Sequence, residues 1–364
     1  GGDEFILFLP EIADLDEASD LCLSTLDLMR EPTEVAGYSL SCGASFGLAR
    51  YPDHGTTIDE LIQTADTAMY HIKRLGSGGC AVFEASMSAE RFSQLELEQE
   101  LRQALAQGDF VAFYQPIVDL ATGALIGVEA LARWRHSRLG LLEPSAFLAL
   151  AEQAGLVPEI DALVQKSALH RGAHWRTLGH DLTVSINCSS AQIERPDFLQ
   201  LVESLCEETG FPLERLQIEL TEQTLVRHVE RAAANIQALR SKGVKVAIDD
   251  FGMGYSSLNY LRQFPVDVLK VDQTFIQEIQ TESDAKAGVS LADAIIAMAK
   301  GLGLNVIGEG VERPAQLAYL YQQGCDQAQG YLFGMPGDEQ EVLSALAEGG
   351  YKDVVEATVS AREK

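Results

Sequence analysis

Short apolar runs rich in β-forming residues alternate with helix-length segments from Phe110 onward, and this alternation limits the fold more than any other feature. Eight runs are candidate strands, at residues 111–118, 125–131, 182–187, 216–220, 244–248, 268–271, 305–308 and 328–333. Segments of helical length lie between most of them, at residues 144–154, 160–178, 198–209, 225–242 and 291–302. Because strands that alternate with helices form parallel sheets, eight strands in roughly 240 residues predict an α/β fold of the TIM (β/α)8 barrel type.

The connection between the first two candidate strands is too short for a parallel pair. Only the turn at residues 119–124, which contains Gly123, joins them. A parallel crossover needs a dozen or more residues, so the first strand is expected to run antiparallel to its neighbour. The predicted fold is therefore a modified barrel with one antiparallel strand.

The first 86 residues differ in character and predict a smaller, partial α/β module. Two glycines at residues 1 and 2 indicate a hairpin, residues 39–48 form a strand-like run, and residues 58–75 are expected to form a helix that glycines then end. Residues 87–106 contain no Gly or Pro and predict one amphipathic helix. We therefore divide the chain into a module at 1–86, a helical linker that begins the second domain at 87–106, the barrel domain at 107–350 and a C-terminal tail at 351–364.

The chain is strongly acidic, with 27 Lys and Arg residues against 54 Asp and Glu residues and a net charge of −27. Duplex nucleic acids bind basic surfaces, so a DNA partner is not expected. If the ligand carries phosphate groups, carboxylates that hold divalent metal ions would neutralise it.

Neither a membrane span nor a disulfide framework is indicated by the sequence. A transmembrane helix needs an apolar run of ~18 residues, and the chain has none. The six cysteines lie far apart without a C-x-x-C pair, so we expect buried free thiols in a reducing cytoplasm. The segment begins without Met, and a membrane anchor upstream in a longer parent protein stays open as an alternative.

Polar residues stand near the carboxyl ends of several predicted strands, the face on which barrel enzymes carry their active sites. They are Glu129, Asn187, Glu219, Asp249, Asp250, Lys270 and Glu309. Carboxylate and amide oxygens select hard cations such as Mg²⁺ or Mn²⁺. The adjacent pair Asp249–Asp250 suits two ions ~3.5–4 Å apart, the spacing used in phosphoryl displacement. The alternative, in which these acids only cap helices and form salt bridges at the rim, does not explain why so many share this position.

The run Glu129-Ala130-Leu131-Ala132-Arg133-Trp134 resembles the signature of the EAL family of cyclic di-GMP phosphodiesterases. Further motifs of that family match in order, at residues 114–117 (YQPI), 185–189 (SINCS), 219–222 (ELTE), 249–258 (DDFGMGYSSL), 267–272 (DVLKVD), 308–312 (GEGVE) and 329–331 (QGY). The resemblance covers about residues 95–347 and implies hydrolysis of cyclic di-GMP to the linear dinucleotide pGpG.

Carried over position by position, the resemblance implies a two-metal site for Mg²⁺ or Mn²⁺. The first ion would be held by Glu129, Asn187, Glu219 and Asp249, and the second by Asp249, Asp250 and Glu309. Lys270 would position or deprotonate the attacking water, and beside two dications its pKa should be lowered. Lys270 and a metal-bound hydroxide both fit the role of proton acceptor. The implied catalytic group is Lys270, Asp250, Glu309 and Glu312.

The same resemblance implies substrate contacts and a homodimer. The dinucleotide would be contacted by Gln115, Leu131, Arg133, Asp267 and Gln329, with Arg133 placed to clamp a phosphate. The loop at 251–258, which links the site to a dimer interface in the family, carries Met253 where Thr is usual. Gly308 stands where Ala is common in the family.

The run Gly1-Gly2-Asp3-Glu4-Phe5 resembles the hallmark of GGDEF-type diguanylate cyclases, and residues 65–70 with Lys73 match a later helix of that family. Asp3 and Glu4 would be its metal-binding and catalytic acids. The first half of that domain is missing, so this segment is not expected to make cyclic di-GMP, and GTP is a candidate ligand only of the module in the longer parent. Two alternatives to hydrolysis stay open: a catalytically inactive EAL-type receptor for cyclic di-GMP, or the regulatory part of a bifunctional GGDEF-EAL protein.

Overall fold

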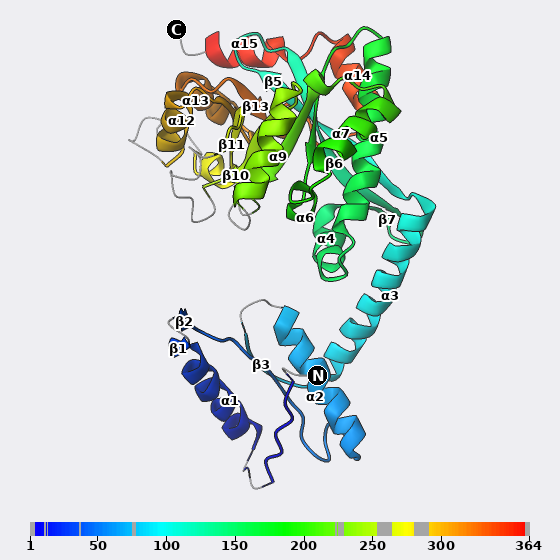
Figure 1. Ribbon diagram of the computed structural model, residues 1–364, viewed down its shortest axis with the longest axis vertical. Helices are drawn as coiled ribbons and strands as arrows, with labels where there is room; N and C mark the ends of the chain where they lie inside the picture. The colour runs from blue at the N-terminus through cyan, green and yellow to red at the C-terminus, as the bar shows by residue number, and fades with distance from the viewer. Residues whose placement is uncertain are drawn as a thin grey trace. The chain divides into compact units, whose positions relative to one another are not determined.

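The computed structural model of the chain describes residues 4–10, 12, 14–35, 38–74, 78–222, 224, 229–252, 264–279 and 291–360. The chain divides into two compact units, residues 1–100 and 101–364, which are described separately (Figure 1). The helix α3 (Ala85–Gln107) contains the boundary between them.

Eight strands of the second unit close into a barrel. Going around it, the order is β5, β13, β12, β11, β10, β9, β8 and β6, and β6 pairs again with β5. Their bounds are β5 (Phe110–Asp119), β6 (Leu125–His136), β8 (Thr183–Asn187), β9 (Leu216–Thr221), β10 (Lys245–Phe251), β11 (Val268–Val271), β12 (Asn305–Gly308) and β13 (Gln327–Gln329). The predicted barrel is confirmed.

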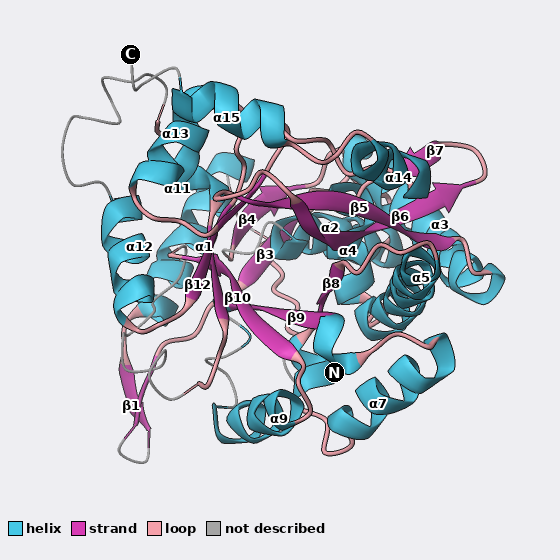
Figure 2. Cartoon of the chain, turned by 90° about the horizontal axis from the view of Figure 1, so that it is seen from above, coloured by secondary structure: helices cyan, strands magenta, loops and turns pink. Residues whose placement is uncertain are grey.

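The first strand of the barrel is antiparallel, as the short turn predicts. β5 pairs antiparallel with both β6 and β13, and β6 and the remaining strands pair in parallel around the barrel. Gly123 takes a φ of 67° in the turn, and its N–H donates to the Asp119 carbonyl at 2.8 Å. Figure 2 shows β5 and β6 side by side as one long hairpin, which the short strand β7 (Gly140–Leu142) extends by pairing with β6.

The last barrel strand is shorter than predicted. It ends at Gln329, whereas the sequence suggested a strand to Phe333. The chain turns at Gly330, where a Cβ atom would lie 2.2 Å from the backbone nitrogen of Val311. Leu332 then donates its N–H to the Val311 carbonyl at 2.9 Å. This close backbone approach, which only glycine permits, replaces the expected strand pairing.

Helices pack outside the barrel strands. Five correspond to predicted segments, namely α4 (Pro144–Gln153), α5 (Val157–Thr177), α7 (Phe198–Thr209), α9 (Val229–Ser241) and α12 (Leu291–Gly301). Others had no sequence prediction, namely α6 (Ser190–Ile193), α11 (Gln273–Gln277), α13 (Pro314–Gln322), α14 (Glu339–Ala347) and α15 (Lys352–Ser360). Within the described ranges, no helix combines the length and the apolar character needed to cross a membrane.

The described residues of the first unit form two helices, two small sheets and the first part of α3. The unit contains α1 (Leu15–Arg30), β1 (Thr33–Val35), β2 (Tyr38–Leu40), β3 (Ser45–Leu48), α2 (Ile58–Arg74) and β4 (Gly79–Val82). The strand-like run at 39–48 is interrupted, because β2 pairs antiparallel with β1 while β3 pairs parallel with β4 in a separate sheet. The predicted hairpin involves residues 1–3, which lie outside the described residues.

All six cysteines are free, as predicted. Cys22, Cys188, Cys206 and Cys325 are buried. Cys42 is exposed and Cys80 is half-buried, so the expectation that every thiol is buried is wrong for these two.

Candidate active site

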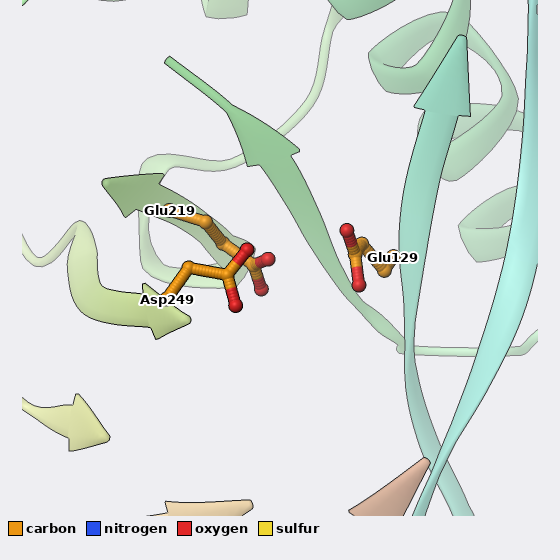
Figure 3. A group of neighbouring side chains, drawn as sticks. All are labelled: Glu129, Glu219 and Asp249. Carbon is orange, nitrogen blue, oxygen red and sulfur yellow. The ribbon is translucent and has the colours of Figure 1, made fainter. Parts of the chain in front are cut away.

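The barrel strands bring the predicted acids together. Glu219 and Asp249 lie near the carboxyl ends of β9 and β10. Glu129 lies in the middle of β6, because this strand continues to His136 and does not end at Leu131 as predicted. One carboxylate oxygen each of Glu129, Glu219 and Asp249 lies within 4.8 Å of the others, and Figure 3 shows these side chains converging from β6, β9 and β10. A second group with the same spacing contains Asp249, Asp250 and Glu309. The two groups share Asp249, which is the arrangement that two neighbouring cations would need.

A local distortion of β10 lets two adjacent aspartates reach one site. The register between β10 and β11 shifts between Ile248 and Phe251, and Asp250 takes a left-handed φ of 53°. Neighbouring residues of a regular strand face opposite sides. The irregularity therefore allows Asp249 and Asp250 to share a group.

Lys270 lies at the centre of the cluster and is fully buried. Its Nζ is 2.6 Å from Glu219, 2.8 Å from Glu309, 3.0 Å from Asp249 and 3.1 Å from Glu129. With all four carboxylates ionised, the cluster and its one ammonium group would carry a formal charge of −3. Such a surplus of buried negative charge favours the binding of further cations.

The surroundings of Lys270 raise its pKa rather than lower it. Burial acts to lower the pKa, but Asp249, Glu129, Glu219 and Glu309 together raise it well above the ordinary value. The expectation of a lowered pKa assumed two neighbouring dications, whereas the neighbours in this structure are carboxylates. The expectation applies to the metal-bound site and stays a prediction; without metal ions, the surrounding carboxylates favour the protonated form of Lys270.

The carboxylates of the cluster do not share one titration behaviour. Burial and the charges of Glu129 and Asp249 raise the pKa of Glu219 to about 8, and burial raises that of Glu309 well above its usual range. Burial and Asp249 raise the pKa of Asp250 to about 6. Burial would also raise the pKa of Glu129, but Lys270 and its hydrogen-bond donors lower it. Bound cations would favour the ionised form of every member.

Amide side chains fix the orientation of Glu129. Asn187 donates its Nδ2 to Glu129 Oε1 at 3.1 Å, and Gln329 donates its Nε2 to Glu129 Oε2 at 2.6 Å. Gln329 Nε2 also lies 2.8 Å from Gln115 Oε1. Gln329 Oε1 is buried and finds no hydrogen-bond partner among the described residues. A buried polar atom without a partner is costly, and a bound ligand would remove that cost.

Two other sequence-predicted residues lie on β6. Arg133 is buried, stacks over Phe113 at 5.5 Å and donates to the Ala132 carbonyl at 2.8 Å. Burial lowers the pKa of Arg133. Leu131 is half-buried on the same strand.

The two loops beside the cluster carry Glu222 and Glu312. Glu222 Oε2 accepts the N–H of Gly252 at 3.1 Å, directly after the aspartate pair. Glu312 follows Glu309 with an exposed side chain, and its backbone N–H donates to Gln316 Oε1 at 2.8 Å. Met253 and the rest of the loop to residue 263 lie outside the described residues.

Asp267 is the one predicted site residue that the structure places elsewhere. It precedes β11, at the amino end of the strand, where Arg240 donates to its carboxylate at 2.7 Å and the Val246 N–H donates at 3.0 Å. Lys270 lies further along the same strand. Since the acidic cluster is at the carboxyl ends of the strands, Asp267 is at the opposite end of the barrel.

One residue next to the cluster was missed by the sequence analysis. Gln217 is buried on β9 and donates its Nε2 to Glu219 Oε1 at 3.1 Å. Its position two residues before Glu219 was a signal that could have found it, because residues two apart on a strand face the same side of the sheet.

Comparisons with known proteins give two domain families. Residues 98–336 match the EAL domain, and residues 1–78 match the diguanylate cyclase GGDEF domain. Two Pseudomonas aeruginosa proteins are similar over most of this chain. The bifunctional diguanylate cyclase/cyclic di-GMP phosphodiesterase MucR is 38% identical over 95% of the chain and 50% of its own length. The cyclic di-GMP phosphodiesterase NbdA is 38% identical over 92% of the chain and 42% of its own length. The chain therefore spans about half the length of these curated relatives.

Solved structures are similar in the barrel region. A structure of the MucR phosphodiesterase in complex with c-di-GMP aligns with a TM-score of 0.63 and 36% identity, covering 68% of this chain and 99% of the other. The EAL enzyme Bd1971, with cAMP and cyclic di-GMP bound, aligns with a TM-score of 0.65 and 31% identity, covering 71% of this chain and 70% of the other.

Proposed function

The chain belongs to the EAL domain family, with part of a GGDEF domain before the barrel, and from this we propose that it hydrolyses cyclic di-GMP to linear pGpG. The proposal rests on the two clusters of three acidic residues that share Asp249. The similar MucR phosphodiesterase structure, which contains c-di-GMP, supports the choice of substrate.

The donor set of the cluster fits divalent metal ions. Glu129, Asn187, Glu219 and Asp249 would hold one ion, and Asp249, Asp250 and Glu309 a second. All of these donors are oxygens, which favours Mg²⁺ or Mn²⁺ over metals that prefer sulfur or nitrogen. When bound, such ions stabilise the negative charge that develops on a phosphate under attack.

The reaction exchanges one bond at phosphorus for another. A water oxygen forms a bond to one of the two bridging phosphorus atoms and loses a proton, the bond from that phosphorus to the 3′ oxygen breaks, and the 3′ oxygen takes up a proton, so that no net proton is gained or lost in these transfers. The opened product keeps the phosphate on its 5′ end. Lys270 Nζ lies 2.6–3.1 Å from four of these carboxylates, and we propose that Lys270 positions or deprotonates the attacking water when the ions are bound.

Substrate contacts are proposed for residues beside the cluster. Gln115 and Gln329 are buried next to Glu129, and Gln329 Oε1 has an unused hydrogen-bond capacity among the described residues. Arg133 and Leu131 follow Glu129 on the same strand, and the guanidinium group suits a phosphate. Asp267 is left out of this set because it lies at the other end of the barrel.

The direct test is a product assay. We expect the chain to convert cyclic di-GMP to pGpG in Mg²⁺ or Mn²⁺ but not in EDTA, as resolved by chromatography. Glu129→Ala removes a shared contact of Lys270, Asn187 and Gln329 and should abolish product formation. Glu208→Ala is the matched control, because Glu208 is an exposed carboxylate on α7 that pairs with Lys166. Tight binding of cyclic di-GMP without product would instead favour the receptor alternative.

Two expectations about the whole protein stay proposals. GTP binding by the N-terminal module depends on Asp3, which lies outside the described residues, and on Glu4, which is exposed. Homodimerisation rests on the family resemblance alone, and size-exclusion chromatography with light scattering measures it directly.

A further inference from the structure

The interior of the barrel directly below the acidic cluster is half apolar and half polar. Ile117, Ala247, Val268 and Ile307 form a buried hydrophobic cluster on one side. On the other side, Ser185 of β8 and Gln217 of β9 lie opposite each other in the parallel register, one inward position before Asn187 and Glu219. Ser185 and Gln217 are 0% and 4% exposed, so both polar groups are removed from bulk water.

Both amide hydrogens of Gln217 have a partner. Nε2 donates to Ser185 Oγ at 2.9 Å and to Glu219 Oε1 at 3.1 Å. The other oxygen of Glu219 accepts from Lys270 Nζ at 2.6 Å. The Glu219 carboxylate is therefore held at both oxygens, by Gln217 from below and by Lys270 from inside the cluster.

Gln217 reaches the acidic cluster through its hydrogen bond to Glu219. Together with Ser185 and Thr183, it lines a cavity of about 180 Å³ near the amino ends of the strands. The predicted metal ligands lie at the carboxyl ends. The contact by which Gln217 can influence the cluster is therefore its hydrogen bond to Glu219.

We propose that Gln217, oriented by Ser185, is a positioning residue that fixes the Glu219 carboxylate for divalent metal binding. A buried amide costs free energy unless it is hydrogen-bonded, and an apolar side chain would continue the hydrophobic cluster without this cost. The amide instead donates its two hydrogens to a hydroxyl group and to a candidate metal ligand. Groups that orient metal ligands in this way typically change metal affinity about 10- to 100-fold when they are replaced. The proposal rests on the proposed function, because it takes Glu219 as a metal ligand.

The test measures Mn²⁺ binding separately from catalysis. Gln217→Met keeps a side chain of similar length without donors, and Gln217→Leu replaces the amide by a shorter apolar side chain. Isothermal titration with Mn²⁺ should show affinity about 10- to 100-fold weaker in both variants. Ile307→Val changes the apolar half of the same interior and should bind Mn²⁺ like the wild type. Thermal unfolding in EDTA checks that all four proteins are folded.

Kinetics then separate a positioning role from a structural one. With cyclic di-GMP as substrate, Gln217→Met should lower kcat at low Mn²⁺, leave KM unchanged and regain activity at high Mn²⁺. Wild-type affinity for Mn²⁺ in folded Gln217→Met overturns the inference while leaving the proposed hydrolysis intact. Weaker Mn²⁺ binding in the variants, with a wild type that makes no pGpG, supports the positioning role and rejects the hydrolysis. A wild type that binds no Mn²⁺ overturns both.

Discussion

Asp161 on α5 is a half-buried acid that contacts the segment next to Asn187. Its carboxyl group makes hydrogen bonds with the side chain and backbone of Ser189, two residues after Asn187. Burial raises the pKa of Asp161 from 3.8 to about 7, although these bonds act to lower it. Between these two pH values the folded state keeps a proton that the unfolded chain releases. The free energy of unfolding therefore falls as pH rises through this window.

Asp161→Asn should remove that part of the pH dependence. The amide has the same shape and can keep the bonds to Ser189, but it never ionises. The variant should match the wild type near pH 4 and exceed it at pH 8 by roughly 2 to 4 kcal/mol, as measured by urea unfolding. Asp197→Asn is the control, because Asp197 is exposed and paired with Arg195 and its pKa is lowered. A difference between Asp161→Asn and wild type that stays constant with pH contradicts the prediction.

For single residues, the position of a polar side chain along its predicted strand was the sequence signal that best predicted the site. Polar residues at the carboxyl ends of neighbouring strands meet in a barrel, as Glu219 and Asp249 do, and Glu129 joins them from the middle of β6. Asp267 was included because it belongs to a motif, although its place before the strand indicates the opposite end. The raised pKa of Lys270 depends on four carboxylates from four separate chain segments, and no local pattern encodes their distances.

At the scale of single elements, predictions from sequence were good for long periodic segments and poor where backbones approach closely. Helix α7 begins and ends at the predicted residues, because its apolar face repeats over three turns and Gly210 follows it. The end of β13 was wrong because Gly330 lies against the backbone of Val311, a contact across separate segments. Non-local contacts of this kind leave no periodic signal in the sequence.

Gly308 offers a test of the packing between a strand and its covering helix. A Cβ atom there would lie 2.4 Å from Leu320 Cδ1 and 2.7 Å from Leu320 Cδ2 of α13. Leu320 is fully buried, so it has little room to move. Gly308→Ala, the residue common in the family, should therefore lower the free energy of unfolding by about 1 to 3 kcal/mol in urea.

Leu320→Ala separates the clash from other effects of the alanine at position 308. Removing the Leu320 methyl groups opens the space, so the double variant should be more stable than additivity predicts by at least ~0.5 kcal/mol. Gly301→Ala is the control, since no atom lies within 4 Å of its added Cβ, and it should be neutral or stabilising. Additive effects of Gly308→Ala and Leu320→Ala would show that the clash is absent.

At the scale of the whole chain, the two units differ in how much they bury. Among the described residues of the first unit, the buried hydrophobic side chains are Ala18, Cys22, Leu26 and Ala68. The barrel unit buries many more, including both tryptophans of the chain, Trp134 and Trp175. Burial of apolar surface is the main source of folding free energy. The first unit should therefore unfold at lower denaturant concentration than the barrel.

The position of the tryptophans makes this difference measurable in the intact chain. Tryptophan fluorescence reports on the barrel unit alone, whereas far-ultraviolet circular dichroism reports on the helices of both units. In urea, we expect an early loss of circular dichroism with unchanged fluorescence, followed by a transition that both probes share. Mn²⁺ in excess should move only the later transition upward, by about 2.7 kcal/mol at 100 times its dissociation constant, because its proposed ligands are all in the barrel. Coincident curves from the two probes, or a shift of the early transition by Mn²⁺, would mean that the units unfold together.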